Sequence, residues 1–146
     1  MSHIPDPRRL PIKRPAQPEA KKVKIVRNHE EDDLQTQIVD LFNLRSGDDV
    51  ICFSVPNGAR VGWKEAKKLK RTGLMKGMTD LVFANLFGLA FFMESKSKKG
   101  SLRKEQRDFR DWCLARNIPW CRVRTLAEAE AFLLKHSLIR PLRTLG

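Results

Sequence analysis

The chain has 146 residues, of which 41% are hydrophobic, so it is long enough for one domain with a packed core. No apolar run reaches the roughly 20 residues of a membrane span, and the three cysteines lack zinc-site, redox-motif or disulfide-scaffold spacing, which favours the cytoplasm. The net charge of +12, from 29 Lys and Arg against 17 Asp and Glu, indicates a polyanionic partner, most often nucleic acid.

The beginning of the chain is basic and rich in proline. Residues 1–29 contain five of the eight prolines and eight basic side chains against two acidic ones. Such a composition buries little apolar surface, so we expect a flexible arm over residues 1–29 and a folded domain over residues 30–146. The arm is either a solvated tail or a tether for DNA. It lacks the apolar segment of a signal peptide.

The first half of the domain predicts a helix, a strand and a second helix. Asn28 is a candidate N-cap for a helix that ends at Ser46-Gly47, because apolar residues recur at helical spacing at Leu34, Ile38, Leu41 and Phe42. A strand is expected over Val50–Val55, followed by a turn at Pro56-Asn57-Gly58. Residues 64–71 are compatible with a helix whose exposed side is almost wholly basic.

The second half predicts a hairpin followed by alternating helices and strands. Asp80–Ala84 and Leu89–Lys96 are apolar runs joined by a tight turn. Next we expect a helix over 102–116 capped by Ser101, a strand over Trp120–Arg124, and a helix to Lys135 opened by the capping box of Thr125 and Glu128. The order of elements predicts an α/β domain with one central mixed β-sheet flanked by helices.

Two basic clusters stand out within the domain. The first contains Arg60, Lys64, Lys67, Lys68, Lys70, Arg71 and Lys76, and the second contains Lys96, Lys98, Lys99, Arg103, Lys104 and Arg107. The chain has no tyrosine, which favours contact with backbone phosphates over stacking on bases. The alternative is that these residues form ordinary solvated faces.

Acidic residues occupy unusual positions in the hairpin. A turn centred on Phe87 sets Asp80 opposite Glu94 and leaves both faces of the hairpin mostly apolar. Two facing carboxylates destabilise a sheet unless a cation compensates them, and Mg²⁺ or Mn²⁺ prefers carboxylate and water oxygens. Lys96 points to the same side as Glu94. The alternatives are a register shifted by one residue or an ordinary Glu–Lys pair.

Two helices direct further polar residues toward the core. At about 100° per residue, Glu31 and Gln35 share the stripe of Ile38 and Phe42. In the later helix, Gln106 lies within an apolar stripe formed by Leu102, Phe109 and Cys113. Each of these residues alone is explained as a cap or a satisfied interior polar group, whereas together they favour one shared polar site.

The order and spacing of these residues resemble those of the VRR-NUC nucleases, the virus-type replication-repair branch of the PD-(D/E)XK superfamily. The resemblance runs from Glu31 to Leu133 and rests on Glu31…Gln35, Pro56-Asn57-Gly58 with Arg60, Gly77-Met78-Thr79-Asp80, Glu94-Ser95-Lys96 and Gln106. Thr79 replaces the proline that usually precedes the motif aspartate. Ser101 also stands farther from Gln106 than the family's serine does.

The resemblance implies a restriction-endonuclease-like core and phosphodiester hydrolysis with one or two Mg²⁺ or Mn²⁺ ions. It implies that Asp80, Glu94, Glu31 and the main-chain carbonyl of Ser95 hold the metal and that Lys96 orients the attacking water. The implied catalytic set is Glu31, Asp80, Glu94, Lys96 and Gln106, with Gln35 close by. Small stand-alone members of the family come from phages and bacteria, resemble Holliday-junction resolvases and act as homodimers.

The resulting functional hypothesis is a structure-selective DNA endonuclease that acts on branched DNA. The expected DNA-binding residues are Arg60, Lys64, Lys67, Lys68, Arg71, Lys98, Lys99 and Arg103. The alternatives are a non-catalytic basic DNA-binding module and a nuclease for flap or linear DNA. The histidines are scattered, and no nucleotide-binding or hydrolase glycine pattern occurs.

Overall fold

A computed structural model describes residues 29–55 and 62–143. Several sequence-based expectations lie outside these ranges: the N-cap at Asn28, the turn at residues 56–58 and the contact residue Arg60. Of the expected arm over residues 1–29 only His29 is described, and it begins the first helix. The domain expected over residues 30–146 is described except for residues 56–61 and 144–146.

The helices and strands follow the expected order closely. They are α1 His29–Arg45, β1 Val50–Ser54, α2 Trp63–Arg71, β2 Leu81–Asn85, β3 Ala90–Ser95, α3 Lys104–Leu114, β4 Trp120–Val123 and α4 Leu126–Lys135. The element bounds differ from the predicted ones by at most two residues, and the largest differences are at the two ends of α3. No helix in the described ranges has the length and apolar character needed to cross a membrane.

The four strands form one mixed sheet in the order β1-β2-β3-β4. The β1–β2 and β2–β3 pairs are antiparallel, whereas β3 and β4 run parallel. In the hairpin, Leu81 pairs with Met93 and Val82 with Phe92, which is the register predicted from a turn centred on Phe87. The same register, continued by one residue, sets Asp80 opposite Glu94.

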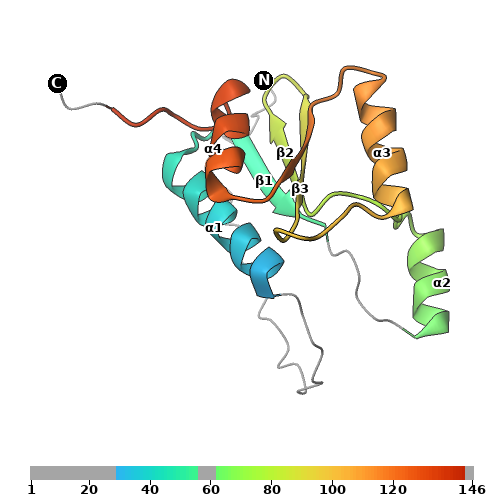
Figure 1. Ribbon diagram of the computed structural model, residues 1–146. Coiled ribbons are helices and arrows are strands. Elements are labelled where there is room, and N and C mark those ends of the chain that lie inside the picture. Colours follow the sequence, from blue (N-terminus) through green and yellow to red (C-terminus); the bar gives the residue numbers. More distant parts are fainter. Residues whose placement is uncertain (1–28, 56–61, 144–146) are drawn as a thin grey trace, which may run out of the picture.

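The main core lies between the sheet and the pair of helices α1 and α4, which cover one of its faces (Figure 1). The hairpin contributes the apolar face that its two-residue alternation predicts, with Leu81, Phe83, Phe91 and Met93 all buried. The opposing helices contribute Leu34, Ile38, Phe42, Ala129 and Leu133. Burying this apolar surface is the main source of stability for the fold.

Helix α3 covers the other face of the sheet over β3 and β4 (Figure 1). The ring of Phe109 meets that of Phe92 edge to face, with centroids 5.1 Å apart. The predicted cap at Ser101 is wrong, because α3 begins only at Lys104 and Arg103 is its N-cap. The Oε1 atom of Gln106 accepts a hydrogen bond from the Arg103 N–H at 2.9 Å. This bond caps the helix at Arg103, and residues 101–103 belong to the preceding loop.

Helix α2 stands apart from the rest of the domain. None of its residues is buried, and it makes at most marginal contact with the other described helices and strands. In Figure 1 it lies beyond the end of the sheet at which α1 and α3 begin. Packing against the core therefore does not explain the composition of α2, which suggests that the helix serves to contact a binding partner.

Candidate active site

The polar residues singled out from the sequence gather where β2 begins and β3 ends. The loop before β2 brings in Asp80, the end of β3 brings in Glu94, and Lys96 follows directly after that strand. The first turns of α1 and α3 lie at the same end of the sheet and carry Glu31 and Gln106 (Figure 1). The fold therefore brings together residues that are up to 75 positions apart in the sequence.

Glu94 is the most enclosed member of this group. Its side chain is 1% exposed, and its Oε1 atom accepts hydrogen bonds from Gln106 Nε2 at 2.5 Å and from Lys96 Nζ at 2.8 Å. Its second oxygen, Oε2, is buried and has no hydrogen-bond partner among the described residues. A buried oxygen without a hydrogen-bond partner costs free energy, so Oε2 is a candidate position for a bound ligand.

Asp80 is half-buried and fixed to the neighbouring strand by the main chain. Its Oδ2 atom accepts a hydrogen bond from the Ser95 N–H at 2.9 Å, and the Val55 N–H donates to its carbonyl at 3.0 Å. Thr79 is buried and donates from Oγ1 to the Leu81 carbonyl at 3.2 Å. The threonine therefore ties down the approach to Asp80 by a local hydrogen bond.

The loop that leads to Asp80 passes close against α3. Gly77 has a φ of +82°, and a Cβ atom at this position would lie 2.4 Å from the Glu105 carbonyl carbon and oxygen. Only glycine combines this backbone conformation with so close an approach. This explains why the motif of Gly77-Met78-Thr79-Asp80 begins with glycine.

Burial and mutual repulsion disfavour the charged forms of the two acids. Burial raises the pKa of Glu94 to about 7, with a further rise from the Asp80 charge and an opposing effect of Lys96. Burial likewise raises the pKa of Asp80, against the hydrogen bond from Ser95 and the charge of Lys96. Two acids thus share one ammonium group, and an additional cation would favour ionisation of both.

Glu31 lies at the margin of the group. It is half-buried in the first turn of α1, and its Oε1 atom accepts a hydrogen bond from the Ser97 N–H at 3.0 Å. Its charge contributes to the raised pKa of both Asp80 and Glu94, which places it within electrostatic range of them. Gln35, one turn further along α1, is also half-buried.

The donor atoms fit a hard divalent cation held by few protein ligands. Within residues 29–55 and 62–143, no group of three or more His, Cys, Asp or Glu side chains is arranged to hold a metal ion. The acids that face each other are Asp80 and Glu94, and their donors are oxygens. Mg²⁺ keeps several waters and binds through one or two carboxylates, so a pair of acids with one unpartnered oxygen suits it.

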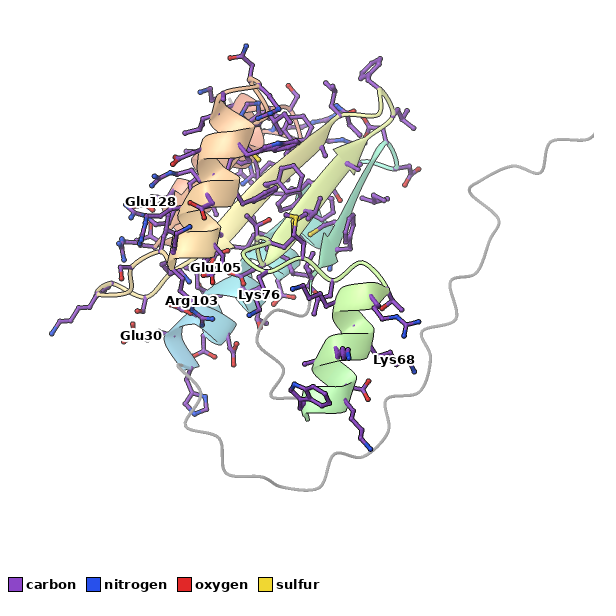
Figure 2. The ribbon with its side chains drawn as sticks, turned by 90° about the vertical axis from the view of Figure 1, so that its right-hand side faces the viewer. Glu30, Lys68, Lys76, Arg103, Glu105 and Glu128 are labelled. Carbon is purple, nitrogen blue, oxygen red and sulfur yellow. The ribbon has the colours of Figure 1, made fainter. Side chains whose placement is uncertain are left out.

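Exposed basic side chains lie on α2 and on the loop between β3 and α3. Lys64, Lys67, Lys68 and Arg71 are exposed on α2, and Lys98, Lys99 and Arg103 are exposed on the loop. Figure 2 shows Lys68 on α2, with Arg103 and Lys76 at the end of the sheet where α1 and α3 begin. The loop after β3 therefore adjoins the acidic group, whereas α2 stands apart beyond the same end of the sheet (Figure 1).

Sequence reasoning missed two residues of this region. Arg124, at the end of β4, donates from Nη1 to the carbonyls of Ser97 and Lys98 and so holds the loop after β3. Nothing in its local sequence signals this contact. Trp63 is 75% exposed at the start of α2, and its position directly before the basic run is the signal that could have identified it.

Comparison with known proteins supports the fold. No model of a known protein family matches the chain, and no curated protein matches it. Among solved structures, a "VRR_NUC domain" is similar with a TM-score of 0.51 and 15% sequence identity, over 73% of this chain and 96% of that chain. The chain therefore has the α/β, restriction-endonuclease-like fold of a VRR-NUC domain.

Proposed function

We propose that this protein is a structure-selective DNA endonuclease that depends on Mg²⁺ or Mn²⁺ and hydrolyses phosphodiester bonds in branched DNA, such as Holliday junctions. The observation that carries the proposal is the state of Glu94. Its carboxylate is enclosed, with a lysine and a glutamine on one oxygen and no partner among the described residues on the other, and it faces a second acid. An ordinary structural ion pair does not require this arrangement.

Asp80, Glu94 and the Ser95 carbonyl would hold one or two divalent cations, with Glu31 adding negative charge beside them. A cation bound there supplies a nucleophilic water and stabilises the charge that develops on the phosphate. Glu31 also holds the loop after β3 through the Ser97 N–H. The chain's own contribution is therefore a rigid set of oxygens at the junction of two strands.

Lys96 and Gln106 have different roles in this scheme. The Lys96 ammonium lies 2.8 Å from Glu94, in position to orient the attacking water and to donate to a phosphate oxygen. Gln106 donates to Glu94 through its amide nitrogen and accepts from the Arg103 N–H through its oxygen. It is thus a positioning residue that fixes the Glu94 carboxylate relative to α3.

DNA would approach over the exposed cations of α2 and of the loop after β3. These side chains provide contacts to phosphates that do not depend on base sequence. We further propose a homodimer, because a twofold arrangement places two active sites on opposed strands of a four-way junction. The three cysteines are all free, which accords with the reducing cytoplasm of a bacterial or phage-infected cell.

The proposal is tested by incubating the protein with matched four-way, flap, splayed and linear DNAs in Mg²⁺, Mn²⁺ or EDTA. We expect cleavage of the branched DNAs with either metal and none in EDTA. Asp33→Asn serves as a control, since it removes an exposed acid from the same turn as Glu31. Binding without cleavage under every metal condition would instead support the non-catalytic module.

A further inference from the structure

The exposed tryptophan of α2 has no structural explanation within the described chain. Trp63 is 75% exposed on a helix in which no residue is buried. We propose that Trp63 stacks on an unpaired base, so that α2 recognises places where a strand leaves the duplex. This inference rests on the proposed DNA-directed function and deepens it by naming unpaired nucleotides as the feature recognised.

The charge of α2 specifies the class of partner. The helix carries one acidic residue, Glu65, against Lys64, Lys67, Lys68, Lys70 and Arg71. In the described part of the chain no carboxylate forms an ion pair with any of these five cations. A helix with this excess of uncompensated positive charge complements a polyanion and repels a second copy of itself.

The position of the indole ring specifies which part of the polyanion it meets. The Nζ atom of Lys67, one helical turn along, lies 5.3 Å from the centroid of the Trp63 ring. Ring and ammonium therefore occupy the same side of α2, where one can cover a planar base while the other pairs with a phosphate. Nucleic acid presents flat aromatic faces and phosphates at adjacent positions.

Trp112 provides an internal comparison. It is also half-exposed, with Arg116 4.5 Å from its ring centroid, but it stacks on Phe109 at 6.1 Å. Trp112 thus extends the packed surface of α3. Trp63 makes no ring–ring contact with any described residue, so the face of its exposed ring that Lys67 does not cover is open to a ligand.

The location of α2 suits recognition of a branch. It lies beyond the end of the sheet that carries Asp80 and Glu94, and the chain runs from α2 through a short loop directly to Asp80 (Figure 1). Bases inside a duplex are already stacked on their neighbours, so only unpaired or terminal bases offer a free face. An anionic lipid surface fits less well, because the apolar residues of α2 are only Trp63, Ala66 and Leu69.

The test uses the intrinsic fluorescence of a Trp112→Phe, Trp120→Phe double variant, in which Trp63 is the remaining tryptophan. Binding is measured in EDTA, so that the result does not depend on cleavage. We expect splayed-arm DNA to quench Trp63 strongly and blunt duplex DNA to quench it weakly.

A second measurement compares binding affinities in the otherwise natural chain. Trp63→Ala should weaken binding of splayed-arm DNA by about 5- to 100-fold and weaken binding of duplex DNA far less. Trp63→Phe should restore most of the affinity.

Trp112→Ala is the matched control and should leave both affinities unchanged, with circular dichroism confirming that each variant folds. Unchanged fluorescence on DNA binding, or equal losses for both DNAs in Trp63→Ala, would overturn the stacking role and leave the proposed nuclease function intact. A response to phosphatidylserine vesicles but not to DNA would overturn it in favour of a lipid surface. Absence of any DNA binding would overturn both proposals.

Discussion

A single carboxylate side chain shows how packing creates chemistry in this protein. Glu94 is enclosed by β3, Lys96 and the first turn of α3, yet within the described part of the chain only one of its oxygens has hydrogen-bond partners. In water the same group would be fully hydrated and ionised, whereas here the protein replaces water with one ammonium and one amide. A ligand that binds Glu94 at Oε2 would therefore satisfy an oxygen that has no partner among the described residues.

The first prediction concerns the roles of Glu94 and Lys96. Glu94→Gln should lower the cleavage rate at least about a thousandfold, because loss of metal ligation removes several kcal/mol of transition-state stabilisation. Lys96→Ala should lower it about a hundredfold, a typical loss for a residue that assists proton transfer. Single-turnover cleavage measures both rates, and electrophoretic shift should show DNA binding retained. Cleavage by Glu94→Gln at the natural rate would contradict the metal assignment.

The second prediction concerns stability and pH in the absence of metal. Burial raises the pKa of Glu94 from 4.5 to about 7, so the folded state binds more protons than the unfolded state between these values. Stability should therefore fall as pH rises from 5 to 8, by about 1 to 3 kcal/mol attributable to Glu94. Urea unfolding in EDTA measures this slope.

Glu94→Gln is the control for that slope, because the amide does not titrate. The difference between the two proteins isolates Glu94 from His136, whose pKa burial lowers and which destabilises the fold as pH falls. Mg²⁺ should restore stability above pH 7 in the natural chain only. Parallel pH profiles for the two proteins would show that Glu94 ionises normally.

Among the secondary-structure elements, the start of α4 was predicted correctly from the sequence, whereas the start of α3 was not. The N-cap predicted at Thr125 is confirmed, because its Oγ1 accepts from the Glu128 N–H at 3.2 Å. The reciprocal bond of the predicted capping box differs, because Glu128 accepts from the Arg124 N–H at 2.8 Å rather than from the N–H of Thr125. The cap predicted at Ser101 is wrong, because Gln106 caps α3 from within the helix while also binding Glu94. Only the second case depends on a distant residue.

The third prediction follows from the cap of α4. Thr125→Ala should lower the free energy of unfolding by about 1 kcal/mol, since it leaves the Glu128 N–H without its partner. Thr36→Ala is the control: Thr36 is exposed inside α1 and only donates back to the Asp32 carbonyl, so its loss should change stability by less than about 0.5 kcal/mol. Equal effects in urea unfolding would show that the cap contributes nothing specific.

At the scale of the whole molecule, charge is distributed separately from packing. The core between the sheet and the helices α1 and α4 is apolar, whereas α2 carries a net positive charge and none of its residues is buried. Changes on α2 should therefore alter binding without altering the fold. This separation makes the electrostatic contribution to DNA binding directly measurable.

The fourth prediction uses that separation. Replacing Lys67 and Lys68 with glutamine should weaken binding of all DNA sequences and reduce the salt slope of binding by roughly 2. Lys135 and Arg143, exposed on and after α4, provide a charge-matched control pair whose replacement should leave the slope unchanged. Binding isotherms over a salt series measure the slopes. Equal slopes for the two double variants would show that α2 faces solvent in the complex.

The order of elements, the hairpin register and the apolar face of the sheet could all be predicted from the amino-acid sequence. These features follow from local periodicity and turn chemistry, as in the pairing of Leu81 with Met93. The candidate acids Asp80 and Glu94 could be identified from the sequence for the same reason, since an acidic residue in an otherwise apolar strand stands out locally. The net positive charge likewise required no structure.

Which of these groups contact one another depends on how the chain folds in three dimensions. The partners of Glu94, the attachment of Glu31 to Ser97 and the hold of Arg124 on the loop after β3 join segments far apart in the chain. The exposure of Trp63 is likewise a tertiary property, because none of the other described helices and strands packs closely against α2. Local preferences act over a few residues, whereas burial and hydrogen-bond satisfaction are properties of the assembled domain.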